Sequence, residues 1–275
     1  MNNNKIRVSL LQIEGRETPI LNASLIKKSL IKAYKFNPDI ICLPECANIM
    51  TANKSHLFKH ATLQKDCPVL EECIQFANKY KKFVSVGSLL LKKKNSSKLL
   101  NRSFFINHSG KIMAYYDKIH LFDVDISRKE VHRESKSFHK GNKVAVVTTP
   151  WGKIGLTICY DIRFPNLYRN LVKQGVKIIL VPAAFTVPTG KDHWEILLRS
   201  RAIENTSFII ATGQCGKHHA RRATYGHSMI VNPWGKIIIK SSKKPKVINA
   251  IIDMCDIENV RSRMPSINHD LNRYN

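Results

Sequence analysis

Apolar residues in the first third of the chain follow strand spacing and helical spacing in turn. Residues 5–13 alternate as a strand does, and residues 39–43 form a second, short apolar strand. The intervening residues 21–36 predict a helix, as do residues 66–82, which lead into an apolar strand at 83–91. Strands and helices that alternate in this way are typical of an α/β sheet. The expected buried positions of the first helix are Leu21, Leu25, Leu30, Ile31 and Tyr34.

After residue 91 the pattern favours hairpins. Strands are expected at 104–107 and 112–116, after a polar turn at 92–101. The span 117–142 shows no regular pattern, and an irregular span of that length in a compact domain usually has a functional role. Its candidate polar residues are Lys118, His120, Asp123, Asp125, Arg133 and Glu134.

The second half of the chain returns to alternating strands and helices. Strands at 144–147 and 154–158 precede a helix at 166–175, and a strand at 177–181 precedes a helix at 189–205. The last predicted strands are 207–213, 228–231, 236–240 and 247–252. No composition break or Gly/Ser linker divides these elements. We therefore expect one α/β domain over residues 1–275, with a core at about 5–252, a polar tail at 253–275, and two mixed sheets packed face to face with helices outside.

One short sequence, Pro-Trp-Gly-Lys-Ile, occurs twice. It begins at Pro150 and again at Pro233, each time between two predicted strands. The repeat predicts two similar hairpins, one from each half of the chain, at the edges of the sheets.

Hydropathy and cysteine content narrow the class of protein. With 275 residues, of which 43% are hydrophobic, the chain can bury a substantial core. No apolar run approaches the roughly 18 residues of a membrane span, and the N-terminal residues lead into a strand without the apolar core of a signal peptide. Seven cysteines without regular spacing indicate reduced thiols rather than a disulfide framework. We therefore expect a cytoplasmic protein that does not bind a membrane.

The formal charge of +25 introduces an alternative, a basic nucleic-acid-binding module. The lysine pairs, such as Lys27-Lys28 and Lys243-Lys244, fall in different predicted elements, and no RNA-binding or helix-turn-helix motif accompanies them. We expect a basic solvated surface and no nucleic-acid partner. Salt-dependent binding to nucleic acid, stronger than that of a similarly charged control, would support the alternative.

Three polar residues directly follow predicted strands: Glu45, Lys118 and Cys159. A thiol at a sharp strand-to-helix turn can be exposed at the carboxyl end of a sheet, where ligands bind in many α/β proteins. A cysteine nucleophile needs a proton acceptor and a donor to the oxyanion. The base could be His120, His193 or a desolvated Glu45, and Lys118 could supply positive charge. Spacing alone does not choose among these arrangements.

Each candidate also has a purely structural interpretation. Cys159 could be an inert buried thiol, the commonest fate of a free cysteine. Lys118 could be one more surface lysine in a lysine-rich chain, and Glu134 could pair with Arg133 or Lys136.

Three segments resemble the signature blocks of the nitrilase superfamily, the carbon–nitrogen hydrolases. They are residues 43–45 (LPE), 116–123 (YDKIHLFD) and 158–165 (ICYDIRFP), and they occur in the family's order. Glu134 matches the additional glutamate of the amidase branches, and the similarity extends from about residue 5 to residue 252.

Within this superfamily the chain is most similar to the Nit1-like branch, which the segments 216–219 and 225–227 favour. Members of this branch include the amidase that removes the amide from deaminated glutathione. The sister omega-amidases act on 2-oxoglutaramate and 2-oxosuccinamate. The resemblance therefore implies an amidase for a small carboxylate-bearing substrate, deaminated glutathione first. Omega-amidase, N-carbamoyl hydrolase and nitrilase activities remain as alternatives.

The resemblance also implies a mechanism in which a glutamate is the base. Glu45 would take the proton of Cys159, and the thiolate would attack the amide carbon. Lys118 and the backbone N–H of Tyr160 would hold the oxyanion, while Glu134 positions Lys118 and the amide. Ammonia would leave behind a thioester, which water activated by Glu45 would hydrolyse to the carboxylic acid.

Further expectations concern the pocket, cofactors and assembly. A glutamate base leaves His120 with a structural hydrogen-bonding role. No metal or organic cofactor is implied, and Cys42 and Cys46 lack a second pair at zinc spacing. The family fold is a four-layer α-β-β-α sandwich, usually assembled as a homodimer. The candidate substrate-binding residues are Tyr160, Arg163, Phe185 and His193, with Arg199 and Arg201 as further cations for a distant carboxylate.

Overall fold

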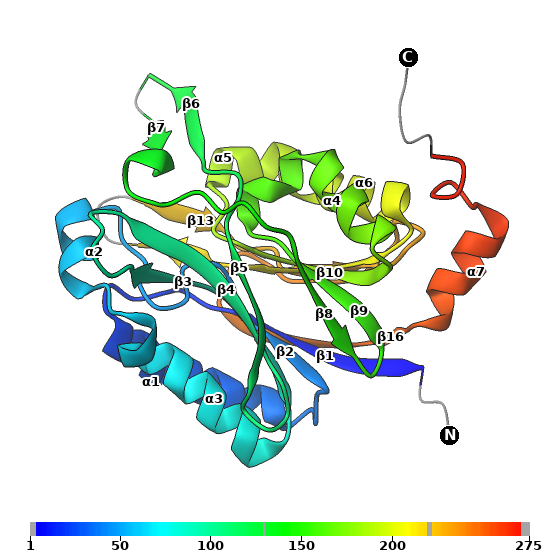
Figure 1. Cartoon of the computed structure of the whole chain (residues 1–275), viewed down its shortest axis with the longest axis horizontal. Coiled ribbons are helices and arrows are strands. Elements are labelled where there is room, and N and C mark those ends of the chain that lie inside the picture. The colour runs from blue at the N-terminus through cyan, green and yellow to red at the C-terminus, as the bar shows by residue number, and fades with distance from the viewer. Residues whose placement is uncertain (1–3, 129, 219–221, 271–275) are drawn as a thin grey trace.

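The computed structural model describes residues 4–128, 130–218 and 222–270, and within them the chain forms two six-stranded mixed sheets. Figure 1 shows the sheets face to face. Helices α1 (Pro19–Tyr34) and α3 (Pro68–Tyr80) cover the outer side of one sheet, and α4 (Pro165–Lys173) and α6 (Glu195–Asn205) cover the other (Figure 1). The predicted four-layer α-β-β-α sandwich is therefore confirmed.

The first sheet has the order β16-β1-β2-β3-β4-β5. Its central strands β1, β2 and β3 are parallel, because α1 and α3 provide the crossovers. The other neighbours pair antiparallel. The bounds are β1 Lys5–Gln12, β2 Ile40–Cys42, β3 Phe83–Lys92, β4 Leu99–Ile106, β5 Ile112–Asp117 and β16 Lys246–Asp253.

The second sheet has the order β15-β14-β11-β10-β9-β8. Strands β9, β10 and β11 are parallel and form its centre, flanked by antiparallel neighbours on both sides. The bounds are β8 Ala145–Thr149, β9 Gly152–Leu156, β10 Val176–Ala183, β11 Phe208–Gly213, β14 Met229–Val231 and β15 Ile237–Lys240.

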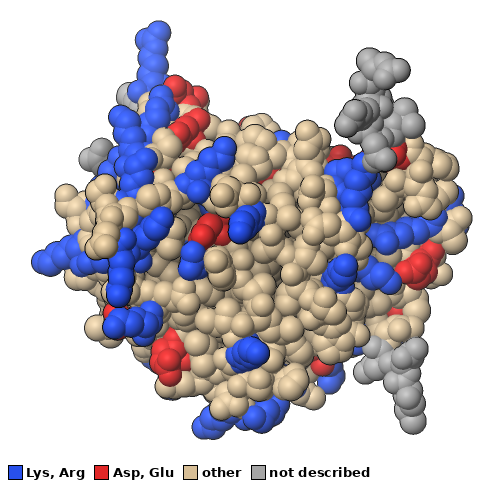
Figure 2. Space-filling model, viewed as in Figure 1, with Lys and Arg blue, Asp and Glu red and all other residues tan. Residues whose placement is uncertain are grey.

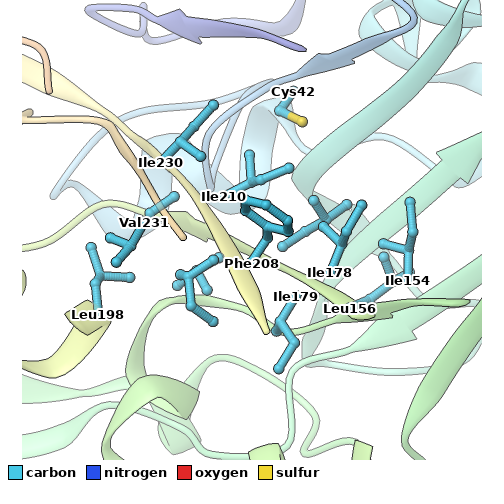
Figure 3. Packing of buried hydrophobic residues seen from close by; sticks show 14 of the residues in the cluster. Cys42, Ile154, Leu156, Ile178, Ile179, Leu198, Phe208, Ile210, Ile230 and Val231 are labelled. Atoms are coloured by element: carbon cyan, nitrogen blue, oxygen red, sulfur yellow. The ribbon is translucent and has the colours of Figure 1, made fainter. Parts of the chain in front are cut away.

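Strand β2 shows why its sequence is apolar without alternation. Ile40 and Cys42 belong to the core between the sheets, whereas Ile41 belongs to the core beneath α1 and α3. Successive side chains of a strand point to opposite faces, so a strand between two apolar layers must be apolar throughout. Figure 3 shows Cys42 of the first sheet beside Phe208 and Ile210 of the second.

The repeated Pro-Trp-Gly-Lys-Ile sequence forms the two hairpin turns that were predicted, β8–β9 and β14–β15. Both hairpins belong to the second sheet and lie at its two opposite edges. Gly152 and Gly235 occupy the same place in each repeat with φ of 106° and 82°. Glycine suits both turns because other residues rarely adopt this backbone conformation.

The predicted buried face of α1 is confirmed at Leu30 but is wrong at Leu21, Ile31 and Tyr34. Leu21 and Ile31 are exposed, while Asn22 is completely buried together with Ile26 and Leu30. The Asn22 side chain donates to the carbonyls of Arg16, Thr18 and Asn48 and accepts from the Arg16 N–H. These bonds satisfy a polar side chain in the interior, which hydrophobic periodicity alone does not reveal.

The span 117–142 is more regular than expected. It contains a hairpin of β6 (Asp123–Ser127) and β7 (Glu130–Arg133), which projects from the body in Figure 1, and a short helix η2 (Glu134–Lys136).

The polar tail contains a helix, α7 (Cys255–Arg263), which packs Ile257 into the main core. The last five residues lie outside the described chain. Other elements not predicted are α2 Lys54–His60, η1 Gln64–Asp66, α5 Val187–Thr189, β12 Cys215–Lys217 and β13 Ala223–Tyr225. The helix predicted at 189–205 begins as the π-helix η4 Gly190–Trp194 and continues as α6.

Strand β3 fixes the segment that follows β2. The Leu43 N–H donates to the Ser85 carbonyl, and the Ala47 N–H donates to the Ser88 carbonyl. A Cβ atom on Gly87 would lie 2.1 Å from the Leu43 carbonyl oxygen, far inside van der Waals contact. Glycine at position 87 therefore allows β3 to approach the backbone just before Glu45.

Basic side chains are dispersed over the visible surface (Figure 2), as the scattered lysine pairs in the sequence predicted. Figure 2 shows Lys and Arg side chains spread over the visible face, with acidic side chains among them. Within the described residues, no helix is both long enough and apolar enough to cross a membrane.

Candidate active site

Three strand ends bring Glu45, Lys118 and Cys159 together. Glu45 follows β2, Lys118 follows β5, and Cys159 begins a short helix, η3 (Cys159–Arg163), after β9. Glu45, Lys118 and Cys159 are only 3%, 2% and 8% exposed, respectively. The Lys118 Nζ atom lies 2.9 Å from Glu45 Oε1, so an ion pair is buried beside the thiol.

Cys159 occupies a sharp turn, as its position in the sequence predicted. Its φ of 48° is left-handed, and such strain in a residue other than glycine is common at functional sites. The Ile158 N–H donates to Asp161 Oδ2, which closes the turn on the other side of the cysteine. Pro165 then begins α4, one residue before the predicted helix start.

The Glu45 carboxylate is fully paired. Its Oε1 accepts from Lys118 Nζ and, at 3.0 Å, from Asn101 Nδ2, and its Oε2 accepts from the Ala184 N–H at 2.8 Å. Burial alone raises the pKa of Glu45, but the Lys118 ammonium and hydrogen bonds from Lys118, Cys159 and Asn101 hold the pKa below its ordinary value. The carboxylate is therefore ionised at neutral pH and can accept a proton.

The Cys159 thiol keeps its proton in the resting site. Burial raises its pKa well above the ordinary value, and the negative charge of Glu45 raises it further, against a smaller opposite effect of Lys118. The thiol and the Glu45 carboxylate are close enough for each to shift the pKa of the other. A neutral thiol next to an ionised carboxylate is the arrangement in which the carboxylate can activate the nucleophile by removing its proton.

Glu134 pairs with Lys118 rather than with Arg133 or Lys136. The Lys118 Nζ atom lies 3.1 Å from Glu134 Oε1 and 2.9 Å from Oε2, and Oε2 also accepts from the Phe122 N–H. Arg133 instead pairs with Asp125 in the β6–β7 hairpin. Although burial lowers the pKa of Lys118, the two carboxylates raise it well above its ordinary value, so the ammonium is retained.

His120 is held by Asp161. His120 Nδ1 lies 2.7 Å from Asp161 Oδ1, and the backbone N–H of His120 donates to the same oxygen. The His120 ring stacks on the Phe164 ring, with the ring centres 3.6 Å apart. Asp161 is completely buried and also accepts from the Tyr116 hydroxyl. Its carboxylate thus joins the loop that carries Lys118 to the turn that carries Cys159.

The four predicted substrate-binding residues lie together beside the turn. Arg163 Nη2 is 3.1 Å from His193 Nδ1, and the guanidinium carbon is 5.8 Å from the Tyr160 ring centre and 5.7 Å from that of Phe185. Tyr160 and Arg163 belong to η3, the short helix that Cys159 begins, so the group lies at the turn that carries the thiol. In the segment 216–219, His219 lies outside the described residues.

Arg199 and Arg201, the further candidate cations for a distant substrate carboxylate, both have structural partners. Arg201 is buried, donates to the Ile162 carbonyl and pairs with Glu204. Arg199 donates to the Gly235 carbonyl and lies 3.9 Å from Glu195. Neither guanidinium is available for a substrate without loss of these contacts.

Sequence reasoning missed Asn101, Asp161 and the Ala184 N–H. Asn101 was assigned to a polar turn, although it follows two leucines that begin β4. Asp161 belongs to the segment that resembles a family block, but its four hydrogen bonds could not be read from spacing. A backbone donor such as Ala184 leaves no signal in the residue type. Within the described chain, no group of three or more His, Cys, Asp or Glu side chains could hold a metal ion.

Comparison with known proteins agrees with the geometry. The sequence profile described as Carbon-nitrogen hydrolase matches residues 7–262. The chain is 40% identical to the deaminated glutathione amidase of Yersinia enterocolitica over 267 residues, which cover 96% of this chain and 92% of that protein. It is 38% identical to the deaminated glutathione amidase of Dictyostelium discoideum, with 98% and 95% of the two chains covered.

Solved structures show the same fold. The Caenorhabditis elegans NitFhit protein superposes with a TM-score of 0.90 at 33% identity; the alignment covers 97% of this chain but 65% of that one. Saccharomyces cerevisiae Nit3, a member of branch 10 of the nitrilase superfamily, superposes with a TM-score of 0.86 at 29% identity, with 95% and 94% covered. The predicted resemblance to the Nit1-like branch is confirmed, and the chain belongs to the carbon–nitrogen hydrolase family, whose members are hydrolases of carbon–nitrogen bonds other than peptide bonds.

Proposed function

We propose that this protein is an amidase that converts the terminal amide of a small carboxylate-bearing molecule to a carboxylic acid and ammonia. The observation that carries the proposal is the buried constellation of a neutral Cys159 thiol, an ionised Glu45 and the Lys118 ammonium. Deaminated glutathione is the first candidate substrate, because several relatives at 34–40% identity bear that name.

In the first half of the reaction, Glu45 takes the proton from Cys159 and the sulfur attacks the amide carbon. The oxygen that gains negative charge is stabilised by the Lys118 ammonium and by the backbone N–H of Tyr160. Such stabilisation is strong in this site because Lys118 is buried and its charge is poorly screened by water. Glu45 then returns the proton to the departing nitrogen, the carbon–nitrogen bond breaks, and ammonia leaves a thioester on Cys159.

In the second half, Glu45 takes a proton from water, and the hydroxide oxygen attacks the thioester carbon. The carbon–sulfur bond breaks, the carboxylic acid is released, and the thiol recovers its proton from Glu45. Glu134 holds Lys118 in position to stabilise the oxyanion, through its two contacts with the ammonium. Glu45 thus takes part in all four proton transfers of the cycle.

The surroundings of Arg163 support the proposal that the substrate carries a carboxylate. No acidic side chain in the described part of the chain pairs with its guanidinium, which lies between aromatic rings and His193. A guanidinium without an acidic partner, in the same short helix as the nucleophile, can bind the far carboxylate of an omega-amide in a bidentate manner.

Replacing Arg163 by methionine tests this assignment. The KM for glutaramate, which carries a carboxylate, is expected to rise about 10- to 100-fold, the effect of losing a charge-assisted pair. Hydrolysis of valeramide, a neutral amide of the same length, should change much less. Arg199→Met, on the exposed side of α6, provides the matched control. Equal effects on both amides would contradict a carboxylate-binding role.

A substrate panel tests the reaction itself. Ammonia release from deaminated glutathione, 2-oxoglutaramate, an N-carbamoyl amino acid and a nitrile separates the proposed activity from its alternatives. The highest kcat/KM is expected for deaminated glutathione. A clear preference for 2-oxoglutaramate would assign the chain to the omega-amidases, and turnover of the nitrile alone would refute the amidase proposal.

We also propose that the protein forms homodimers, supported by an apolar stripe on its surface. Ile196 and Ile203 on α6 are 66% and 45% exposed, and Trp234, next to the Gly235 turn that contacts Ile203, is 50% exposed. Burial of these side chains against a second copy would remove apolar surface from water. Sedimentation equilibrium should give twice the chain mass; a monomer at all concentrations would oppose this assembly.

A reducing compartment, such as the cytoplasm, fits the state of the thiols. All seven cysteines are free and six are buried. The nucleophile must also be a free thiol to react.

A further inference from the structure

Asn101 lies between the two carboxylates of the site. It belongs to β4, is 1% exposed, and its Nδ2 atom donates to Glu45 Oε1 at 3.0 Å and to Glu134 Oε1 at 3.2 Å. The Lys118 Nζ atom contacts the same two oxygens at 2.9 and 3.1 Å. Two nitrogens and two oxygens thus form a closed ring in which donors and acceptors alternate.

This ring has an electrostatic reason. Two ionised carboxylates that share one partner repel each other, and Lys118 supplies one positive charge for two negative ones. The Asn101 amide adds one hydrogen bond to each carboxylate without adding another charge. Its orientation is unambiguous, because the opposite orientation would turn the Oδ1 acceptor toward both carboxylates.

The other end of the amide shows which part of Asn101 matters. Asn101 Oδ1 is buried and has no hydrogen-bond partner among the described residues. An unpaired buried acceptor is costly, so the side chain is placed for its donors. Its backbone contributes as well, since the Lys118 N–H donates to the Asn101 carbonyl at 3.0 Å.

We infer that Asn101 is a positioning residue of the reaction, which holds the Glu45 carboxylate in the orientation that faces the Cys159 thiol and keeps Glu134 on Lys118. This inference rests on the proposed role of Glu45 as the base. The Asn101 hydrogen bond is also among the contacts that lower the pKa of Glu45. The other titratable groups near Glu45 are Lys118, Glu134, Cys159 and the adjacent thiol of Cys46.

Alkylation of Cys159 by iodoacetamide measures this activation without a substrate. The sulfur forms a bond to the methylene carbon, the carbon–iodine bond breaks, iodide leaves, and the thiol proton passes to Glu45. Quantifying the Cys159 peptide by mass spectrometry separates it from the exposed Cys255. The rate is measured against pH for the wild type, Asn101→Ala and Asn101→Asp.

The matched control is Ser103→Ala. Ser103 lies two residues along the same strand, on the same face, is equally buried, and donates only to the Val86 carbonyl. Both Asn101 variants should move the acid limb of the alkylation rate upward by roughly one pH unit and lower kcat more than they raise KM. Ser103→Ala should leave the acid limb in place.

The outcomes separate this inference from the proposed function. An acid limb that does not move in Asn101→Ala, or wild-type alkylation in Asn101→Asp, would overturn the positioning role, since aspartate has the size of asparagine but not its donors. Glu45→Gln serves as the second arm. If it alkylates at the wild-type rate, the proposed base is wrong; if it loses alkylation while Asn101→Ala does not change, only the role of Asn101 fails.

Discussion

Cys159→Ala is expected to abolish ammonia release and to leave the fold intact. Removing a covalent nucleophile should lower kcat by about 10⁴-fold or more, because the remaining groups can bind and polarise an amide but cannot form the thioester. The free energy of unfolding should change by about 1 kcal/mol or less, since only one sulfur atom is lost from a site that is already polar. Steady-state kinetics and urea unfolding measure the two quantities.

Cys73→Ala is the matched control for this variant. Cys73 is also buried and its pKa is raised, yet it lies in the core beneath α1 and α3. The Cys73→Ala variant should lose about as much free energy of unfolding as Cys159→Ala and keep full activity. Substantial turnover by Cys159→Ala would exclude the thioester mechanism, and equal losses of activity in both variants would indicate a packing effect instead of chemistry.

The proximity of Glu45, Lys118 and Cys159 could be predicted from their positions in the sequence. Glu45, Lys118 and Cys159 each come one to three residues after the end of a strand, and ligands of many α/β proteins bind at the carboxyl ends of strands. Apolar runs such as β2 are visible because both faces of the strand are buried. Which side chain would act as the base was not decided by spacing, and the family resemblance suggested Glu45.

Polar residues with internal partners were the least predictable. Asn22 faces the core because four backbone groups satisfy its amide, and the predicted face of α1 was therefore rotated. Asn101 was assigned to a turn, the usual place of asparagine, but Lys118, Glu45 and Glu134 place it in β4. In both positions tertiary hydrogen bonds outweigh the local preference.

The β6–β7 hairpin escaped prediction for a different reason. The residues of its two strands, Asp123–Ser127 and Glu130–Arg133, are exposed or half-buried, so neither strand packs a fully buried face. Only two apolar residues, Val124 and Ile126, alternate with polar ones in β6, and so short a pattern was not recognised as a strand. The hairpin nevertheless precedes Glu134 directly and so contributes to the position of that carboxylate.

Lys118→Met is expected to damage both catalysis and stability. Methionine preserves much of the length and apolar volume of the lysine stem, but it leaves the buried Glu45 and Glu134 without their cation. Breaking a buried ion pair from one side typically costs about 3–5 kcal/mol, and loss of the oxyanion donor should lower kcat by roughly 10³-fold. Urea unfolding and steady-state kinetics at pH 7.5 measure these losses.

The double variant Lys118→Met/Glu134→Gln separates charge from packing. Replacing Glu134 by its neutral isostere removes one of the two uncompensated charges, so the double variant should be more stable than Lys118→Met alone. Activity should not return, because the cation is still absent. If the second substitution lowers stability further, the cost of the first is not electrostatic.

The dependence of this loss on pH has a definite sign. In the wild type the pKa of Glu45 lies below its ordinary value, so its stabilising contribution is present above the unfolded pKa of about 4.3 and fades as pH falls through the folded pKa. Without Lys118, burial raises the pKa of Glu45 above the unfolded value, so the folded variant holds the proton more tightly than the unfolded chain. The penalty of the variant is then small in acid and grows as pH rises. The stability difference between wild type and Lys118→Met should therefore widen between pH 4.5 and pH 7.5, whereas a constant difference would mean that Lys118 acts through packing alone.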